Sequence, residues 1–212
     1  MALFLEHKED ALTWGVWQTE ESVEQLLALL PSAAQYEAEL LRLTAPHRRR
    51  EWLAVRVLLY RLLGEEKTIS YHSNGKPYLA DRSCFISISH TRGYVAVILS
   101  SQGEVGIDIE QYGSRVHKVA HKYMRPDEVP APYEGDDTWS LLLHWSAKEV
   151  MFKCMGASGV NFREHLHVLP FEVKKSGEFC AREYRTPRQT QFLIRYLLHP
   201  CFVMTWCCVG KD

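Results

Sequence analysis

The chain has 212 residues, which is enough for one large domain or two small ones. With 46% hydrophobic and 24% charged residues it has the composition of a globular protein, which excludes a largely disordered chain. The net charge of −1 argues against nucleic-acid binding through a general excess of positive charge. Any anion-binding site must therefore be a local cluster of basic residues.

Targeting signals and metal-binding cysteine patterns are not evident in the sequence. The first nine residues, Met-Ala-Leu-Phe-Leu-Glu-His-Lys-Glu, lack the apolar core of a signal peptide, and no run of 18 apolar residues predicts a transmembrane helix. The cysteines form no C-x-x-C pair, so we expect free thiols and a reducing, cytoplasmic location without membrane binding. These cysteines are Cys84, Cys154, Cys180, Cys201, Cys207 and Cys208.

Helices are predicted first in chain order, after an apolar segment that contains Trp14 and Trp17. The segment 20–30 is an acidic helix candidate, and 32–43 continues as helix after a proline. Pro46–Leu63 has the clearest helical period, with a proline in the first turn and a glycine directly after it as the stop.

Strands follow a Gly-Lys-Pro turn signal at 75–77. The segments 85–89 and 105–110 alternate apolar and polar residues, and 94–99 is a continuous apolar run. Because the connections between them are short, we expect these three strands to form one antiparallel meander.

The second half follows a similar plan, with helices before strands. A helix is predicted over 115–123, followed by a short acidic turn and a loop. Thr138–Met155 is a strong helix candidate, with Asp137 or Thr138 as the N-cap and Gly156 as the stop. Strands are predicted over 166–173, 178–184, 191–198 and 202–209.

Two carboxylates occupy alternate positions of the Gly-Ile-Asp-Ile-Glu segment at 106–110. In a strand, Ile107 and Ile109 would point into a core, while Asp108 and Glu110 would share the opposite face, roughly 7 Å apart. Such a pair suits Mg²⁺, which takes one or two protein carboxylates and fills its remaining positions with water and substrate phosphate. A half-buried strand with charged residues on its wet face is the ordinary alternative.

A third carboxylate occurs in the predicted helix Thr138–Met155. Trp145, Glu149 and Lys153 have the spacing i, i+4, i+8 and therefore lie on one face. Glu149 could reach a metal ion while Lys153, one turn further on, reaches a phosphate. The alternative is a surface Glu–Lys pair, which stabilises a helix by roughly 0.3–0.5 kcal/mol.

The combination of these motifs resembles the 4′-phosphopantetheinyl transferases of the longer, monomeric type that activate peptide synthetases and other carrier proteins. The family's strand motif reads Val-Gly-Ile-Asp-Ile-Glu at 105–110, and its helix motif reads Trp-Ser-Ala-Lys-Glu-Val-Met-Phe-Lys at 145–153. The upstream Gly-Lys-Pro at 75–77 and Ile-Ser-His at 88–90 match as well. The match covers roughly 45–155, and residues beyond it match only in strand character.

The resemblance implies an α+β fold of two similar halves, each with helices against an antiparallel sheet, packed by pseudo-two-fold symmetry. We expect the halves to be 1–104 and 105–212, tightly packed with the active site between them, in a monomer. No low-complexity linker separates them.

The resemblance also implies roles for individual residues. Asp108, Glu110 and Glu149 would hold Mg²⁺, or Mn²⁺, against the pyrophosphate of coenzyme A, and Lys148 would orient the site. The residues expected to bind coenzyme A are Lys153 and His90 at its phosphates, Lys76 and Ser89 at its nucleotide end, and Arg49 and Arg56 as selected members of the basic cluster.

The implied reaction transfers 4′-phosphopantetheine from coenzyme A to a serine hydroxyl of an apo acyl or peptidyl carrier protein and releases 3′,5′-ADP. Glu149 or Glu128, directly or through a metal-bound water, would take the serine proton. Glu128 corresponds to a glutamate that follows a phenylalanine in the family, whereas this chain has Tyr123. Two other readings stay open: a regulator that binds coenzyme A or a carrier protein without catalysis, and a metal-dependent hydrolase of small phosphate compounds.

Overall fold

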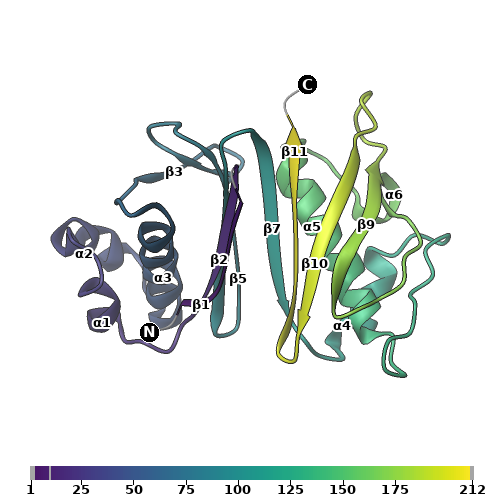
Figure 1. The fold of residues 1–212 in the computed structure, drawn as a ribbon, viewed down its shortest axis with the longest axis horizontal. Helices are drawn as coiled ribbons and strands as arrows, with labels where there is room; N and C mark the ends of the chain where they lie inside the picture. Colours follow the sequence, from purple (N-terminus) through teal and green to yellow (C-terminus); the bar gives the residue numbers. More distant parts are fainter. Residues whose placement is uncertain (1–2, 10, 211–212) are drawn as a thin grey trace. The chain divides into compact units, whose positions relative to one another are not determined.

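The computed structural model describes residues 3–9 and 11–210 and has the α+β architecture that the sequence predicts. The chain divides into two compact units, Met1–Gln102 and Gly103–Asp212. Figure 1 labels the helices and strands of both units. Among the described residues, no helix is both long enough and apolar enough to cross a membrane.

The first unit has a four-stranded antiparallel sheet with the strand order β1-β2-β6-β5. A separate hairpin of β3 and β4 carries the Gly-Lys-Pro turn. The elements of this unit are β1 (Leu3–Glu9), β2 (Leu12–Gln18), α1 (Val23–Leu27), α2 (Ala33–Arg42), α3 (Pro46–Leu63), β3 (Ile69–Tyr71), β4 (Pro77–Leu79), β5 (Phe85–Thr91) and β6 (Tyr94–Ser100).

Helix α3 packs against β2 and β6 and provides the largest share of the core of the first unit. Leu53 and Leu58 of the helix and Val97 of β6 are completely buried. Gly15 of β2 lets the helix approach closely, because an added Cβ would lie 2.9 Å from the Cδ1 atom of Leu58. The helix ends at Gly64, whose φ of +74° is accessible to glycine at little cost.

The second unit has a five-stranded antiparallel sheet with the strand order β7-β11-β10-β9-β8. Its elements are β7 (Gly103–Gln111), α4 (Arg115–Val119), the 3₁₀ helix η1 (Ala120–Lys122), α5 (Thr138–Met155), α6 (Phe162–His165), β8 (Leu166–Val168), β9 (Ser176–Glu183), β10 (Gln191–His199) and β11 (Phe202–Gly210).

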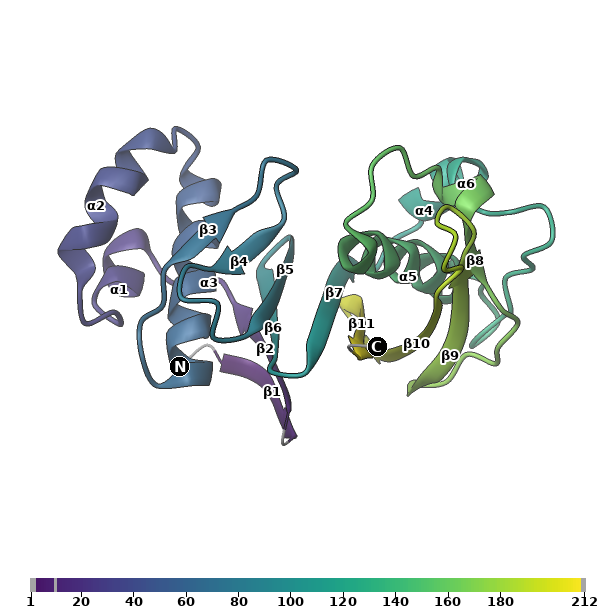
Figure 2. The same ribbon diagram turned by 90° about the horizontal axis from the view of Figure 1, so that it is seen from above.

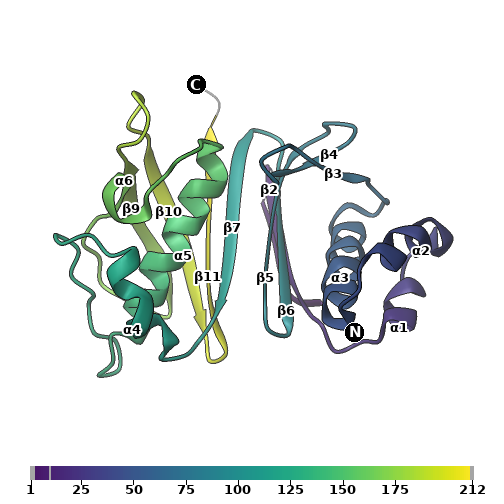
Figure 3. The ribbon, with the colours of Figure 1, turned by 180° about the vertical axis from the view of Figure 1, so that it is seen from behind.

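Helix α5 lies across one face of this sheet, as the views in Figures 2 and 3 show, and contacts β7 and β11 most extensively. Gly106 of β7 makes this contact close. An added Cβ there would lie 2.7 Å from the carbonyl oxygen of Val150 and 2.9 Å from the Sγ atom of Cys154. The glycine that precedes the two carboxylates therefore brings α5 and β7 close together.

The two units share a topological plan. In each unit, an 18-residue helix ends at a left-handed glycine. The last strand of each unit then pairs antiparallel with the strand that directly precedes the helices. These pairs are β2 with β6 and β7 with β11. The first unit adds β1, so its sheet is not identical in composition to the second.

Several predicted elements need correction. The meander is wrong, because β5 pairs with β6 while β7 pairs with β11 in another sheet. The helix predicted over 20–30 is shorter, since α1 spans only Val23–Leu27. The strand predicted over 166–173 ends at Val168.

The N-cap of α5 is Asp137, one of the two residues that the sequence predicts for this position. Asp137 occupies the cap position without a side-chain hydrogen bond to the helix. The preceding residue, Asp136, satisfies a donor of the first turn, because its Oδ1 atom accepts hydrogen bonds from both the backbone N–H and the hydroxyl of Thr138, each at 2.8 Å. The predicted helices Pro46–Leu63 and Thr138–Met155 are confirmed.

Candidate active site

Strand β7 holds the first two predicted carboxylates. Ile107 and Ile109 are 0% and 1% exposed, as the alternation predicts. Asp108 is itself buried at 4% exposure and lies opposite Thr205 of β11 in the ladder. Glu110, the next residue on the same face of the strand, is half-buried. The carboxylates therefore lie in a partly enclosed environment and not on a fully solvated strand face.

Helix α5 presents its predicted face to these carboxylates. Trp145 donates its indole N–H to Glu110 Oε1 at 2.7 Å. The Nζ atom of Lys153 donates to Asp108 Oδ1 and to the carbonyl oxygen of Ile107, each at 2.8 Å. In a helix that is otherwise mostly buried, these two residues and Glu149 between them are half-buried. The spacing i, i+4, i+8 thus places them together beside β7.

Electrostatics shows that the three carboxylates influence one another. Burial, followed by the charge of Asp108, raises the pKa of Glu110 to about 7, and Glu149 adds to this rise. Burial and the charge of Asp108 also raise the pKa of Glu149, which the charge of Lys153 counteracts. Carboxylates that are buried near one another in this way are stabilised by a cation.

The donor set fits a hard divalent cation such as Mg²⁺ or Mn²⁺, because Asp108, Glu110 and Glu149 offer only oxygen ligands. Their oxygens do not all lie within 4.8 Å of one another in this structure. Two of them have other partners here: Asp108 binds the Lys153 ammonium group, and Glu110 accepts the indole N–H of Trp145. Side-chain rotation at these positions would be needed to surround an ion.

Lys148 and Glu128 form a pair away from solvent. Both side chains are 0% exposed, and Lys148 Nζ lies 2.7 Å from Glu128 Oε2. The remaining contacts of the Glu128 carboxylate are with the backbone N–H groups of Arg125 and Val168. Lys148 also donates to the carbonyl oxygen of Tyr123, and burial lowers its pKa. The pair joins α5 to the loop before it and to β8.

A cavity of about 260 Å³ in the first unit contains two of the predicted coenzyme A ligands, Arg56 and His90. Arg56 is 8% exposed, stacks on the Trp52 ring at 3.2 Å and donates to the Trp52 carbonyl oxygen. Burial lowers the pKa of Arg56 to about 10, so the side chain stays charged at neutral pH. The other residues that line the cavity are Leu43, Arg48, Glu51, Val55, Tyr71 and Ile88.

The remaining predicted ligands do not line this cavity. Lys76 lies in the β3–β4 turn, where its backbone N–H donates to Asn74 Oδ1. Ser89 is buried within β5. Arg49 turns its guanidinium group toward the carbonyl oxygen of Leu43. Arg48, which we did not select from the sequence, lines the cavity instead and lies 2.9 Å from His90 Nε2.

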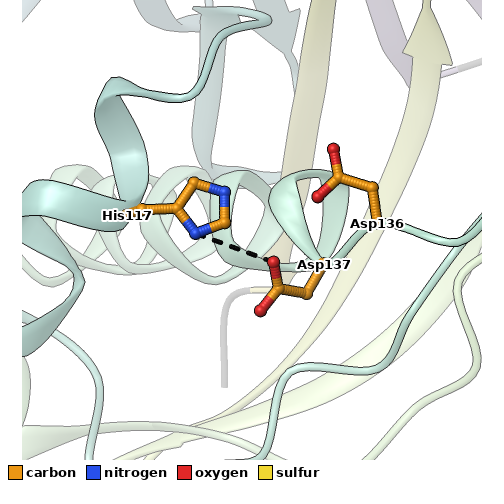
Figure 4. A group of neighbouring side chains, drawn as sticks. All are labelled: His117, Asp136 and Asp137. Carbon is orange, nitrogen blue, oxygen red and sulfur yellow. Dashed lines mark ion pairs between the residues drawn. The ribbon is translucent and has the colours of Figure 1, made fainter.

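A second group of polar side chains lies at the start of α5 (Figure 4). His117, Asp136 and Asp137 offer ligand atoms that all lie within 4.8 Å of one another, and no other such group occurs within 3–9 and 11–210. His117 Nδ1 lies 3.6 Å from Asp137, and its Nε2 atom lies 2.8 Å from Thr138 Oγ1. Because Asp136 accepts hydrogen bonds from Thr138, the first residue of α5, this group stabilises the helix start.

Residues 104–207 match the family model of the 4′-phosphopantetheinyl transferase superfamily. The chain therefore contains a domain of the 4′-phosphopantetheinyl transferase superfamily. The match runs from β7 to β11 and includes all three predicted metal ligands, together with Lys148 and Lys153.

Curated relatives support the assignment to this superfamily. The chain is 44% identical over 125 residues to the 4′-phosphopantetheinyl transferase AcpT of Salmonella typhimurium, covering 52% of this chain and 61% of that protein. It is 33% identical over 129 residues to AcpT of Escherichia coli, covering 56% and 65%. It is 33% identical over 115 residues to slr0495 of Synechocystis sp., covering 49% of this chain and 47% of that protein. The chain thus spans about half to just under two thirds of these relatives.

Proposed function

We propose that this protein transfers 4′-phosphopantetheine from coenzyme A to a serine hydroxyl of an apo acyl or peptidyl carrier protein, with a divalent metal ion, and releases 3′,5′-ADP. The observation that carries the proposal is the meeting of Asp108 and Glu110 on β7 with Glu149 and Lys153 on α5, inside the superfamily domain. The names of the AcpT relatives agree with this activity.

The three carboxylates would hold the metal ion, preferably Mg²⁺. When bound, it would neutralise the pyrophosphate and the charge that develops on the leaving phosphate. Phosphoryl transfer depends mainly on positioning and charge neutralisation, so these residues need not act as nucleophiles. Burial, followed by repulsion from Asp108, raises the pKa of Glu110 and Glu149, and this supports a cation-binding role.

Lys153 would bind a phosphate of coenzyme A. In the present structure its ammonium group neutralises Asp108. A metal ion on Asp108 would take over this neutralisation, leaving Lys153 available to an anionic substrate. The position of Lys153 one turn beyond Glu149 supports this role, since both side chains would then face the pyrophosphate.

Glu149 is our choice as the base that accepts the serine proton. Its side chain is half-buried and lies between Trp145 and Lys153 on the face of α5 that meets β7, where a substrate could reach it. Glu128 has no exposed side-chain surface and three hydrogen-bond donors around its carboxylate. We therefore infer that Glu128 and Lys148 position α5 and do not contact the substrate.

The cavity of the first unit would bind the nucleotide end of coenzyme A. Arg48 and Arg56 provide the cationic groups that a 3′-phosphate requires, and His90 lines the cavity beside Arg48. Trp52 and Tyr71, with aliphatic neighbours, provide flat apolar walls. Lys76 and Ser89 are proposed to contact the same end of the molecule from outside the cavity.

Mass spectrometry of an apo carrier protein incubated with the protein, coenzyme A and Mg²⁺ tests the proposal. A phosphopantetheine mass gain on the carrier is expected, together with formation of 3′,5′-ADP. Binding of coenzyme A without a mass gain on any carrier of a broad panel would favour the non-catalytic regulator. Consumption of coenzyme A in the absence of a carrier would favour a hydrolase.

A further inference from the structure

Glu51 is an acidic residue in the lining of the first unit's cavity, which also contains Arg48 and Arg56. Its Oε2 atom lies 3.5 Å from Arg48 Nη1 and 3.6 Å from His90 Nε2. Arg48 can neutralise the carboxylate at this distance, but both distances are too long for good hydrogen bonds. Within the described part of the chain, this oxygen has no hydrogen-bond partner, although it is shielded from solvent.

A buried carboxylate oxygen without a hydrogen bond is costly, because it loses its contacts with water and gains none in return. Glu51 keeps 22% side-chain exposure, so the carboxylate borders the cavity and is not sealed within the core. An acid beside Arg48, in a cavity that Arg56 also lines, would weaken a site meant only for phosphate. Its presence indicates a ligand that offers a hydrogen-bond donor next to its anionic group.

We propose that Glu51 accepts a hydrogen bond from the ribose 2′-hydroxyl of the bound nucleotide. The inference rests on the proposed function, in which Arg48, Arg56 and His90 bind the 3′-phosphate of coenzyme A. The 2′-hydroxyl is attached to the carbon next to the one that bears this phosphate. A donor at that position can reach Glu51 while the phosphate contacts Arg48 and His90, which lie beside Glu51.

The adenine amino group is a poorer fit, because it lies at the far end of the base from the 3′-phosphate. The base would instead lie against Trp52 or Tyr71, which line the same cavity. Arg48 is the residue that would move on binding. Its side chain is 57% exposed, so it can turn toward the phosphate and uncover the Glu51 oxygen. Glu51 thus becomes a specificity residue for ribonucleotides.

Titration calorimetry with two ligands tests the inference on the whole protein. The ligands are 3′,5′-ADP and 2′-deoxyadenosine 3′,5′-bisphosphate, which differ only in the hydroxyl group. The unmodified protein should bind 3′,5′-ADP about tenfold or more tightly than the deoxy ligand, as expected for a hydrogen bond to a charged group. In Glu51→Ala the two affinities should become equal.

Controls separate a direct contact from a structural effect of the substitution. Glu51→Gln keeps an oxygen acceptor at the same position and should retain part of the preference. Glu37→Ala, which removes an exposed glutamate of α2, should leave the preference unchanged. Because the two ligands are first compared on the unmodified protein, the test does not depend on the folding of any variant.

The outcomes also distinguish this inference from the proposed function. Equal affinities of the unmodified protein for the two ligands would overturn the 2′-hydroxyl contact and leave the nucleotide site in place. A preference that persists in a folded Glu51→Ala protein would assign the discrimination to another residue and would also overturn the inference. Failure of either ligand to bind would count against the nucleotide site itself.

Discussion

Lys153 and Asp108 are joined across 45 residues of sequence by a hydrogen-bonded ion pair of 2.8 Å. The same ammonium group donates to the carbonyl oxygen of Ile107, so it binds the strand through both a side chain and the backbone. This contact fastens the last turn of α5 to β7. It also keeps the buried carboxylate neutralised in the absence of other cations.

Asp108→Asn should abolish metal-dependent transfer while preserving the fold. The substitution removes the charge and keeps the shape, and loss of one central electrostatic stabiliser typically reduces kcat by about 10²–10³-fold. Transfer is measured by mass spectrometry of the carrier, and the fold by circular dichroism. Glu172→Gln, at an exposed site of the same unit, is the matched control. Near-normal turnover of a folded Asp108→Asn protein would refute the metal assignment.

Lys153→Ala should weaken the binding of coenzyme A, since a cation near the phosphates would be lost. Calorimetry at low salt should show the difference most clearly, and added salt should reduce it because the interaction is screened. Lys174→Ala, which removes an exposed lysine of the same unit, should have no effect. If Lys153→Ala binds coenzyme A as tightly as the unmodified protein at low salt, the phosphate role is wrong.

Lys148→Met should destabilise the protein strongly, because it leaves Glu128 buried without its cationic partner. Removing one member of a buried ion pair typically costs about 3–5 kcal/mol. The double substitution Glu128→Gln with Lys148→Met removes both charges and should recover a large part of the loss in thermal melts. If the double variant folds but transfers nothing, Glu128 or Lys148 has a chemical role beyond positioning.

Glu183 should make stability depend on pH in the acid range. Its burial alone would raise the pKa, but hydrogen bonds from Thr186, Thr190 and Arg185 lower it below the ordinary value of 4.5. The stabilisation is therefore complete above that value and is lost as the pH falls through the lower pKa of the folded state.

Glu183→Gln should accordingly lower the free energy of unfolding by about 2 kcal/mol at neutral pH. The difference between the variant and the unmodified protein should shrink as the pH drops below about 4.5. Urea unfolding at a series of pH values measures this. A difference that stays constant down to the acid transition would show that the hydrogen bonds do not depend on the charge.

Charge reversal at Lys118 and Lys122 should raise KM for the carrier several-fold and leave KM for coenzyme A unchanged. Both lysines are exposed on α4 and η1, and the segment 111–126 contains no acidic residue. Rim charges act mainly on the encounter with an acidic partner. Charge reversal at Lys174 and Lys175 is the control, and unchanged carrier kinetics at low ionic strength would exclude this face.

The ends of the long helices could be predicted from the sequence, because the residues that mark them lie at the ends themselves. Pro46 and Gly64 mark the ends of α3, and Gly156 marks the end of α5, so period and termination signals agreed with the structure. The partner of β7 could not be inferred in this way. Short connections suggested pairing with β6, but the ladder is formed with β11, about a hundred residues downstream.

The site was predictable where residues share one helix face, as Trp145, Glu149 and Lys153 do. The Glu128–Lys148 contact was not, because it depends on how a loop packs against α5. Arg48 was overlooked although its spacing gave a usable signal. Arg48, Trp52 and Arg56 are related by i, i+4, i+8 and all line the same cavity.

The pairing of β7 with β11 has a consequence for biosynthesis. Asp108 lies opposite Thr205, so its strand lacks its ladder partner until residues 202–210 have emerged from the ribosome. Contacts this distant in sequence form slowly, and unpaired strand edges are prone to misassembly meanwhile. The nascent chain should therefore acquire its carboxylate cluster only after β11 has been made, whereas the sheet of the first unit is complete once β6 has been made.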